Sequence, residues 1–212
     1  MALEHHPRIV TSGLFVYFDP ANTRSYSGLG ITLNNLFAGY GATLVNGPTF
    51  SSSNAGYLSF DGTNDYVQFT LPALTNWSFS FWIYNHQVAN LAEKQLLSTN
   101  TDPTGLSMLF TKYNIWNGSS NYSNSSIAQS TWSNVVFTNS SGGSSAIYID
   151  GSLDASFSTS NQIYAGDAQL LAILSTQRNT PAFLGSFLGY NRPITAAEVL
   201  QNYNATKKRY GK

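Results

Sequence analysis

Two aspartates and an asparagine stand close enough in the sequence to hold a metal ion together. Asp61, Asn64 and Asp65 belong to the segment Phe-Asp-Gly-Thr-Asn-Asp-Tyr. Carboxylate and amide oxygens are the ligands that a hard cation such as calcium takes in proteins, and Asp19 could contribute a further one. The same segment is typical of a tight turn, because Asp bonds its own backbone and Gly supplies a positive φ. The turn is the preferred interpretation and calcium the alternative, and no other cofactor is expected.

Aromatic side chains beside a stretch rich in Asn and Ser predict a carbohydrate site. The stretch is NGSSNYSNSSIAQS, residues 117–130. Flat rings stack on the faces of sugars while amides bond the sugar hydroxyls. The candidate residues are Tyr113, Trp116, Asn117 and Tyr122. In the alternative interpretation Tyr113 and Trp116 are ordinary strand residues on opposite faces of a sheet.

Catalytic groups are scarce. Hydrolysis of a glycosidic bond needs two carboxyl groups facing one cleft, roughly 5–10 Å apart. The only glutamates are Glu4, Glu93 and Glu198, and we expect Glu4 in an extended arm and Glu198 at a helix cap. No Gly-x-Ser-x-Gly nucleophile motif occurs, and the absence of cysteine excludes a thiol nucleophile and zinc–thiolate sites. We therefore expect no catalytic residues and no enzyme.

Strand patterns dominate the chain, and one convincing helix follows them. In residues 77–84 the apolar Trp77, Phe79 and Phe81 alternate with residues of the opposite face, as a strand requires. Near the C-terminus, Thr195-x-x-Glu198 forms a capping box, which predicts a helix start. The expected strands are 14–18, 43–45, 57–60, 65–69, 77–84, 95–99, 106–111, 113–116, 135–138, 146–150, 170–174 and 183–188. These elements predict an all-β fold with one short C-terminal helix.

Several of these segments resemble the concanavalin A-like, laminin G-like jelly roll. GLFVYFDP (13–20) is similar to the first strand of that family, and LVNGPTF (44–50) and YLSFDGTNDYVQF (57–69) to the next strands. WSFSFWIY (77–84) resembles its core strand, and WSNVVFTNSSGGSSAIYIDG (132–151) its Trp-led hairpin. The resemblance implies a two-sheet antiparallel jelly-roll sandwich. Some members of the family bind calcium, and its glucanases carry a Glu-x-Asp-x-x-Glu run that this chain lacks.

The ends of the chain resemble the variant of this domain that is common in structural proteins of tailed phages. They read HPRIVTSGL and NYNATKKRYG. The resemblance implies a non-enzymatic virion protein, either a capsid decoration protein or a tail or fibre component. The alternative is a carbohydrate-binding module that attaches to host glycans, and a glycan-cleaving enzyme comes last. The expected partners are other virion proteins, copies of the chain itself and host surface glycans.

Composition and charge fit a protein that packs against neighbours. Only 9% of the 212 residues are charged and the formal net charge is zero, so no overall field recruits nucleic acid or a membrane surface. We expect an extended arm over 1–12, a sandwich domain including the helix over 13–206, and a basic tail over 207–212. The assembly contacts expected in the two ends are Arg8, Lys207, Lys208 and Arg209. The first residues lack the apolar core of a signal peptide, so we expect synthesis in a host cytoplasm and a place in the virion.

Overall fold

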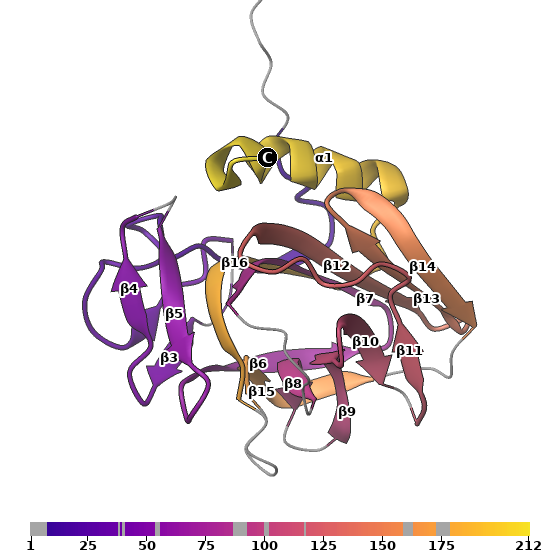
Figure 1. Cartoon of the computed structure of the whole chain (residues 1–212), viewed down its shortest axis with the longest axis horizontal. Helices are drawn as coiled ribbons and strands as arrows, with labels where there is room; N and C mark the ends of the chain where they lie inside the picture. The colour runs from indigo at the N-terminus through magenta and orange to yellow at the C-terminus, as the bar shows by residue number, and fades with distance from the viewer. Residues whose placement is uncertain are drawn as a thin grey trace, which may run out of the picture.

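Two antiparallel sheets pack face to face, and a helix lies on the outer face of one of them (Figure 1). The computed structural model describes residues 8–37, 39, 41–53, 56–86, 93–99, 102–116, 118–158, 163–172 and 179–212. The expected fold class, an all-β two-sheet sandwich with one short C-terminal helix, is confirmed.

The first sheet, sheet A, has the strand order β14-β13-β12-β7-β16-β5-β4, with β1 beside β16. Its strands are β1 (Leu14–Phe18), β4 (Thr49–Ser51), β5 (Tyr57–Asp61), β7 (Trp77–Asn85), β12 (Trp132–Ser140), β13 (Ser144–Ile149), β14 (Ser152–Ser158) and β16 (Pro181–Tyr190). All pairs are antiparallel, and β7 and β16 at the centre pair along most of their length.

The second sheet, sheet B, has the order β11-β10-β9-β8-β15-β6-β3-β2. Its strands are β2 (Thr32–Leu33), β3 (Ala42–Val45), β6 (Tyr66–Leu74), β8 (Lys94–Thr99), β9 (Asp102–Leu109), β10 (Lys112–Trp116), β11 (Ser120–Tyr122) and β15 (Tyr164–Leu170). Of the expected strand at 170–174, only Leu170 belongs to a strand, as the last residue of β15; 171 and 172 do not, and 173–174 lie outside the described residues. Strands β11 and β14 were not expected from the sequence.

The core lies between the sheets and follows the alternation of the strands. Trp77, Phe79 and Phe81 of β7 point inward and are completely buried. From β16, Phe187 stacks against Phe79 with ring centroids 5.8 Å apart, and it meets Phe69 of sheet B edge-on at 5.7 Å. Burial of these large rings is the main stabilising contribution to the sandwich.

The C-terminal helix α1 (Ala196–Thr206) covers part of the outer face of sheet A (Figure 1). The expected capping box is confirmed: Thr195 Oγ1 accepts from Glu198 N–H, and the Glu198 carboxylate accepts from Thr195 N–H. Ile194 and Val199 are buried against sheet A. Ser78 of β7 anchors the start of the helix, because its hydroxyl accepts from Ile194 N–H and donates to the Arg192 carbonyl.

The described part of the N-terminal arm runs along this helix. Val10 N–H donates to Asn202 Oδ1 over 2.8 Å, and the Val10 carbonyl accepts from the Tyr190 hydroxyl over 3.0 Å. The Arg8 carbonyl accepts from the Gln201 side chain. None of the helices in the described part of the chain has the length and apolarity that a membrane span requires.

Candidate functional site

Tyr113, the first residue of the expected carbohydrate site, belongs to the core. It is 1% exposed and faces the opposite sheet, where its hydroxyl accepts from Asn85 Nδ2 over 3.3 Å. Burial raises the pKa of Tyr113 to about 12. The ring therefore has no free face for a sugar, and this part of the expected site is wrong.

Trp116 and Tyr122 lie on the outer face of sheet B, on the neighbouring strands β10 and β11, and both are half-buried. The amides around them hold the two strands together. Asn114 Oδ1 accepts from Asn121 N–H over 2.9 Å, and Asn121 Nδ2 donates to the Ile115 carbonyl over 3.1 Å. Asn117 lies outside the described residues. These amides stabilise a sheet edge, so they are poorly available for a ligand.

The Asp61–Asp65 segment forms the tight turn that its sequence predicts. Asp61 Oδ1 accepts from the N–H groups of Thr63 and Asn64, and these bonds lower the pKa of Asp61. Asp65 Oδ2 accepts from Asp61 N–H, and burial raises the pKa of Asp65. In the described parts of the chain no group of three or more His, Asp or Glu side chains is arranged for a metal. The turn thus accounts for both carboxylates, and calcium stays an untested prediction.

The expected basic tail is folded into the domain as a short 3₁₀ helix, η1 (Lys207–Tyr210). Arg209 Nη1 lies 2.7 Å from Asp19 Oδ2 in a largely buried ion pair, and Arg209 Nη2 also donates to two backbone carbonyls. Tyr210 is 6% exposed and stacks on Trp82 with centroids 4.1 Å apart. Lys212 pairs with Asp150. These contacts contradict the expectation that 207–212 is a separate docking tail.

The remaining basic residues of the two ends lie nearer the surface. Lys207 Nζ is 5.3 Å from the centre of the Tyr203 ring, while the side chains of Arg8 and Lys208 are exposed. Arg8 and Lys208 keep the accessibility that an assembly contact needs.

Glutamates of the described chain stabilise the fold. The Glu198 carboxylate accepts from the two terminal guanidinium nitrogens of Arg192, Nη1 and Nη2, at 2.7–2.8 Å, and this pairing lowers the pKa of Glu198 to about 2. Glu93 accepts from the Ser107 hydroxyl over 2.8 Å. The Glu198 carboxylate therefore lacks the raised pKa of a general acid.

A cluster of aromatic side chains that the sequence analysis did not single out lies on the outer face of sheet A, beyond the end of the C-terminal segment. We call it the aromatic row. Its members come from the adjacent strands β5, β16, β7 and β12 and from the residue after β7, and they are Tyr57, Phe183, Tyr84, Trp132 and His86. In the register, Tyr84 lies opposite both Phe183 and Trp132. Cross-strand pairing thus brings together residues from four distant parts of the chain.

Ring contacts hold the aromatic row in place. Phe183 lies between two tyrosines, with centroids 4.1 Å from Tyr57 and 5.4 Å from Tyr84, and both pairs are stacked. Trp132 meets the two tyrosines edge-on, and His86 meets Phe183 edge-on at 3.9 Å. Trp132 also packs on Tyr210 of η1 with centroids 5.0 Å apart. The C-terminal segment therefore supports one end of the row.

The aromatic row carries polar groups that remain unused. Within the described residues, no hydrogen bond is made by the hydroxyls of Tyr57 and Tyr84, the indole N–H of Trp132 or the imidazole of His86. Although His86 is exposed overall, desolvation of its ring lowers its pKa, which favours the neutral form. Half-buried rings with several free donors and acceptors are the chemistry of a surface that binds an uncharged polar ligand.

Comparisons with known proteins place the chain in a fold family. Its fold is similar to that of Trypanosoma rangeli sialidase in complex with the inhibitor DANA (13% identity, TM-score 0.72, 95% of this chain and 34% of that one). It is also similar to the botulinum neurotoxin type G receptor binding domain (20% identity, TM-score 0.68, 91% of this chain and 51% of that one). A third similar structure is domain 4 of AbnA, a GH43 extracellular arabinanase from Geobacillus stearothermophilus, in complex with arabinotriose (14% identity, TM-score 0.69, 91% of this chain and 98% of that one).

The chain thus spans about a third of the sialidase and half of the neurotoxin domain. No curated protein matches it in sequence. A family model described as the concanavalin A-like lectin/glucanases superfamily, of laminin G type, matches residues 61–200. The chain belongs to this family.

Proposed function

We propose that this chain is a non-catalytic carbohydrate-binding domain and that the aromatic row is its binding surface. The observation that carries the proposal is the convergence of five rings and several unused polar groups on one face of sheet A. Sugars combine apolar C–H faces with hydroxyls, so they can contact ring edges and bond the tyrosine hydroxyls at once.

Two further observations support a carbohydrate ligand. The row contains no Asp, Glu, Lys or Arg, and the lowered pKa of His86 favours its neutral ring, which suits a neutral ligand. The arabinanase domain of similar fold was solved with arabinotriose.

The proposal of a non-catalytic role rests on the carboxylates. Glu198 is paired with Arg192, and Asp61 caps its own turn. A glycosidase needs an acid and a base or nucleophile in one cleft, and no carboxylate belongs to the aromatic row.

Binding and turnover can be measured together on the full chain. Titration calorimetry against a panel of neutral oligosaccharides should find saturable binding to at least one of them, without release of reducing ends. Because the aromatic row is uncharged, the affinity should change little between low and high salt. Failure to bind any glycan would overturn the proposed function, and turnover of a bound glycan would overturn its non-catalytic part.

We further propose that the domain is displayed on a virion, as a decoration protein or a tail or fibre component. This rests on the resemblance of the chain ends to phage structural proteins and on the low charge of the chain. Mass spectrometry of purified phage particles should detect the chain at a fixed copy number per particle. Its absence from intact particles would contradict this placement.

A further inference from the structure

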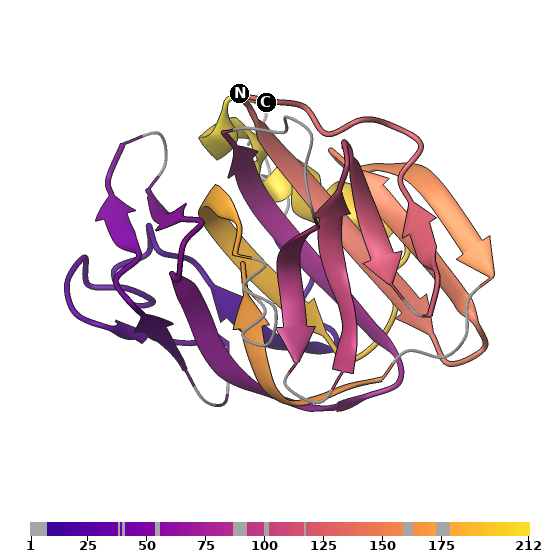
Figure 2. The same ribbon diagram turned by 60° about the horizontal axis from the view of Figure 1, so that its bottom comes forward.

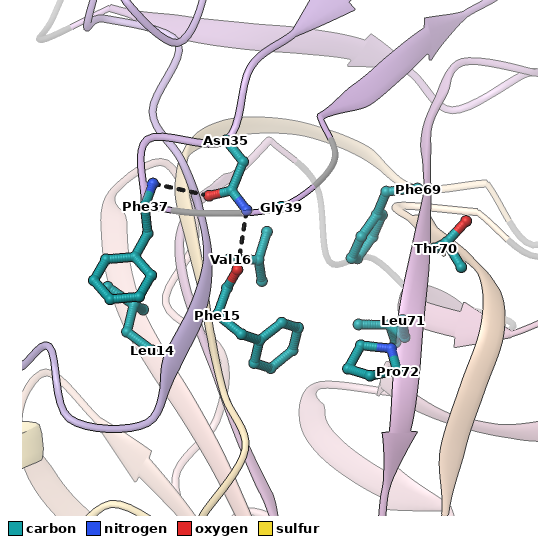
Figure 3. A pocket seen from close by; sticks show the side chains of 10 residues that line it. All are labelled: Leu14, Phe15, Val16, Asn35, Phe37, Gly39, Phe69, Thr70, Leu71 and Pro72. Atoms are coloured by element: carbon teal, nitrogen blue, oxygen red, sulfur yellow. Dashed lines mark hydrogen bonds between the residues drawn. The ribbon is translucent and has the colours of Figure 1, made fainter.

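An apolar cavity opens at one corner of the sandwich and shares no residue with the aromatic row (Figure 3). Its volume is about 490 Å³. It is lined by residues of β1, of the connection before β3 and of β6: Leu14, Phe15, Val16, Asn35, Phe37, Gly39, Phe69, Thr70, Leu71 and Pro72.

The cavity exists because strands stop short in both sheets at this corner. In sheet A, β5 pairs with the first half of β16 and β1 with the second half, so β1 is an edge strand. In sheet B, β3 pairs with β6 only over 66–68. The open space lies between Phe15 and Val16 on one side and Phe69, Leu71 and Pro72 on the other (Figure 3).

The polar groups of the lining are engaged or face elsewhere. Asn35 Oδ1 accepts from the N–H groups of Tyr17 and Phe37 at 3.0 and 3.1 Å, and its Nδ2 donates to the Phe15 carbonyl over 2.9 Å (Figure 3). Asn35 thereby covers the edge of β1 as a partner strand would. Thr70 is exposed and alternates with the core residues Phe69 and Leu71, so its side chain lies on the outer face of sheet B.

Among the described residues, no charged residue lines the cavity. A charged group entering it would lose its hydration without finding a partner. An apolar lining favours hydrocarbon groups over polar ones, because their burial removes apolar surface from water, and the volume falls in the range of roughly 300–1,000 Å³ that is usual for ligand sites.

From this lining we propose that the cavity binds an uncharged hydrocarbon group, such as the alkyl chain of a neutral amphiphile. The proposal is independent of carbohydrate binding, because the two sites use different residues and opposite chemistry.

The neutral fluorophore N-phenyl-1-naphthylamine tests this directly, since its emission rises in apolar surroundings. The full chain should give a saturable rise, and decanol should displace the fluorophore. Decanoate at pH 8 should displace it at least about tenfold more weakly, which corresponds to 1.4 kcal/mol. Equal displacement by decanol and decanoate would overturn the uncharged class of ligand.

Two variants locate the site. Leu71→Phe narrows the cavity from within, and Pro72→Trp narrows it from its exposed rim, where folding is least affected. Leu200→Trp on α1 is the matched control, because Leu200 is exposed and lies outside the cavity. Both cavity variants should weaken decanol binding about tenfold or more, while the control binds like the wild type.

Absence of a saturable signal, or equal decanol binding by the wild type and both cavity variants, would overturn the proposal. Since the cavity variants leave the aromatic row intact, they should bind any glycan ligand like the wild type. Loss of decanol binding and loss of glycan binding therefore report on separate sites.

Discussion

The outer faces of the two sheets are covered by side chains of opposite character, apolar and aromatic on sheet A and polar on sheet B. On sheet A, α1 and η1 lay apolar and aromatic side chains over the strands, and the aromatic row continues beyond them. On sheet B, turned toward the reader in Figure 2, buried polar side chains bond one another across strands. Ser107 of β9 and Asn114 of β10 are one such pair, in which Asn114 Nδ2 donates to Ser107 Oγ over 3.2 Å.

This difference bears on where a ligand can bind. On sheet B, Asn114 and Ser107 are completely buried and bonded to each other, so their donors and acceptors are not available to a sugar. Aromatic side chains that cover a sheet pack through their ring faces, and the hydroxyls and nitrogens at their ring edges stay available to a ligand. The contrast favours the aromatic row over the expected site at Trp116 and Tyr122.

The largest effect on stability should come from removing an aromatic ring that covers the outer face of sheet A. Tyr210→Ala removes a buried ring that stacks on Trp82 and packs on Trp132. We expect a loss of about 3–5 kcal/mol of unfolding free energy, as for other buried aromatic truncations, measured from urea denaturation midpoints. Leu200→Ala, an exposed change on α1, should shift the unfolding free energy by less than about 0.5 kcal/mol. Equal denaturation midpoints for Tyr210→Ala and Leu200→Ala would mean that η1 does not stabilise the outer face of sheet A.

Removing a buried polar contact from the outer face of sheet B should cost less unfolding free energy than Tyr210→Ala, but still a measurable amount. Asn114 is completely buried, and its removal leaves Asn121 N–H and the Ser107 hydroxyl without this partner. Asn114→Ala should therefore cost about 2 kcal/mol in the same denaturation experiment. Ser126→Ala in the neighbouring exposed loop is the control. An unchanged unfolding free energy in Asn114→Ala would show that water replaces these hydrogen bonds at no cost.

The ion pair at the helix start should make stability depend on pH. Arg192 lowers the pKa of Glu198 to about 2, from 4.5. A lowered folded-state pKa adds stability above the unfolded value, so the contribution is complete above pH 4.5 and is lost as the pH falls through 2. Because the pair is partly exposed, its contribution is modest. At pH 7 the unfolding free energy of the wild type should exceed that of Glu198→Gln by about 1.5 kcal/mol. A difference that persists unchanged at pH 2 would contradict the assigned pairing.

The smallest effect concerns the helix cap. Thr195 Oγ1 accepts from Glu198 N–H, so Thr195→Ala should lower the unfolding free energy by about 1 kcal/mol. Thr195→Ser keeps the hydroxyl and should retain most of the stability. If Thr195→Ser loses as much as Thr195→Ala, the side-chain methyl group and not the cap is responsible.

Local signals made part of this structure predictable. The capping box needs only residues 195–198, and the alternation of 77–84 fixes which side chains of β7 point inward. The family resemblance supplied the sandwich topology. Strand β14 escaped prediction because SLDASFS lacks a run of β-branched residues.

The candidate site was harder to predict because it depends on strand order. Residues 57, 84, 132 and 183 meet only when β5, β16, β7 and β12 pair in that sequence. The one local signal was the presence of two aromatic residues, Trp82 and Tyr84, on the face of 77–84 that begins with serines. Tyr113 was misassigned because composition does not show which face of β10 meets the core. Arg209 finds its partner Asp19 190 residues away, so its burial had no local signal.

Glycan affinity after removal of hydroxyls from each sheet face is the most direct test of the central claim. The double variant Tyr57→Phe/Tyr84→Phe keeps the rings of the aromatic row but deletes its two free hydroxyls, while Tyr122→Phe does the same on sheet B. Two lost hydrogen bonds of about 1 kcal/mol each should weaken binding of the best oligosaccharide at least about tenfold in the double variant. Tyr122→Phe should bind like the wild type. Full affinity in the double variant together with weakened binding by Tyr122→Phe would contradict the account and place the site on sheet B.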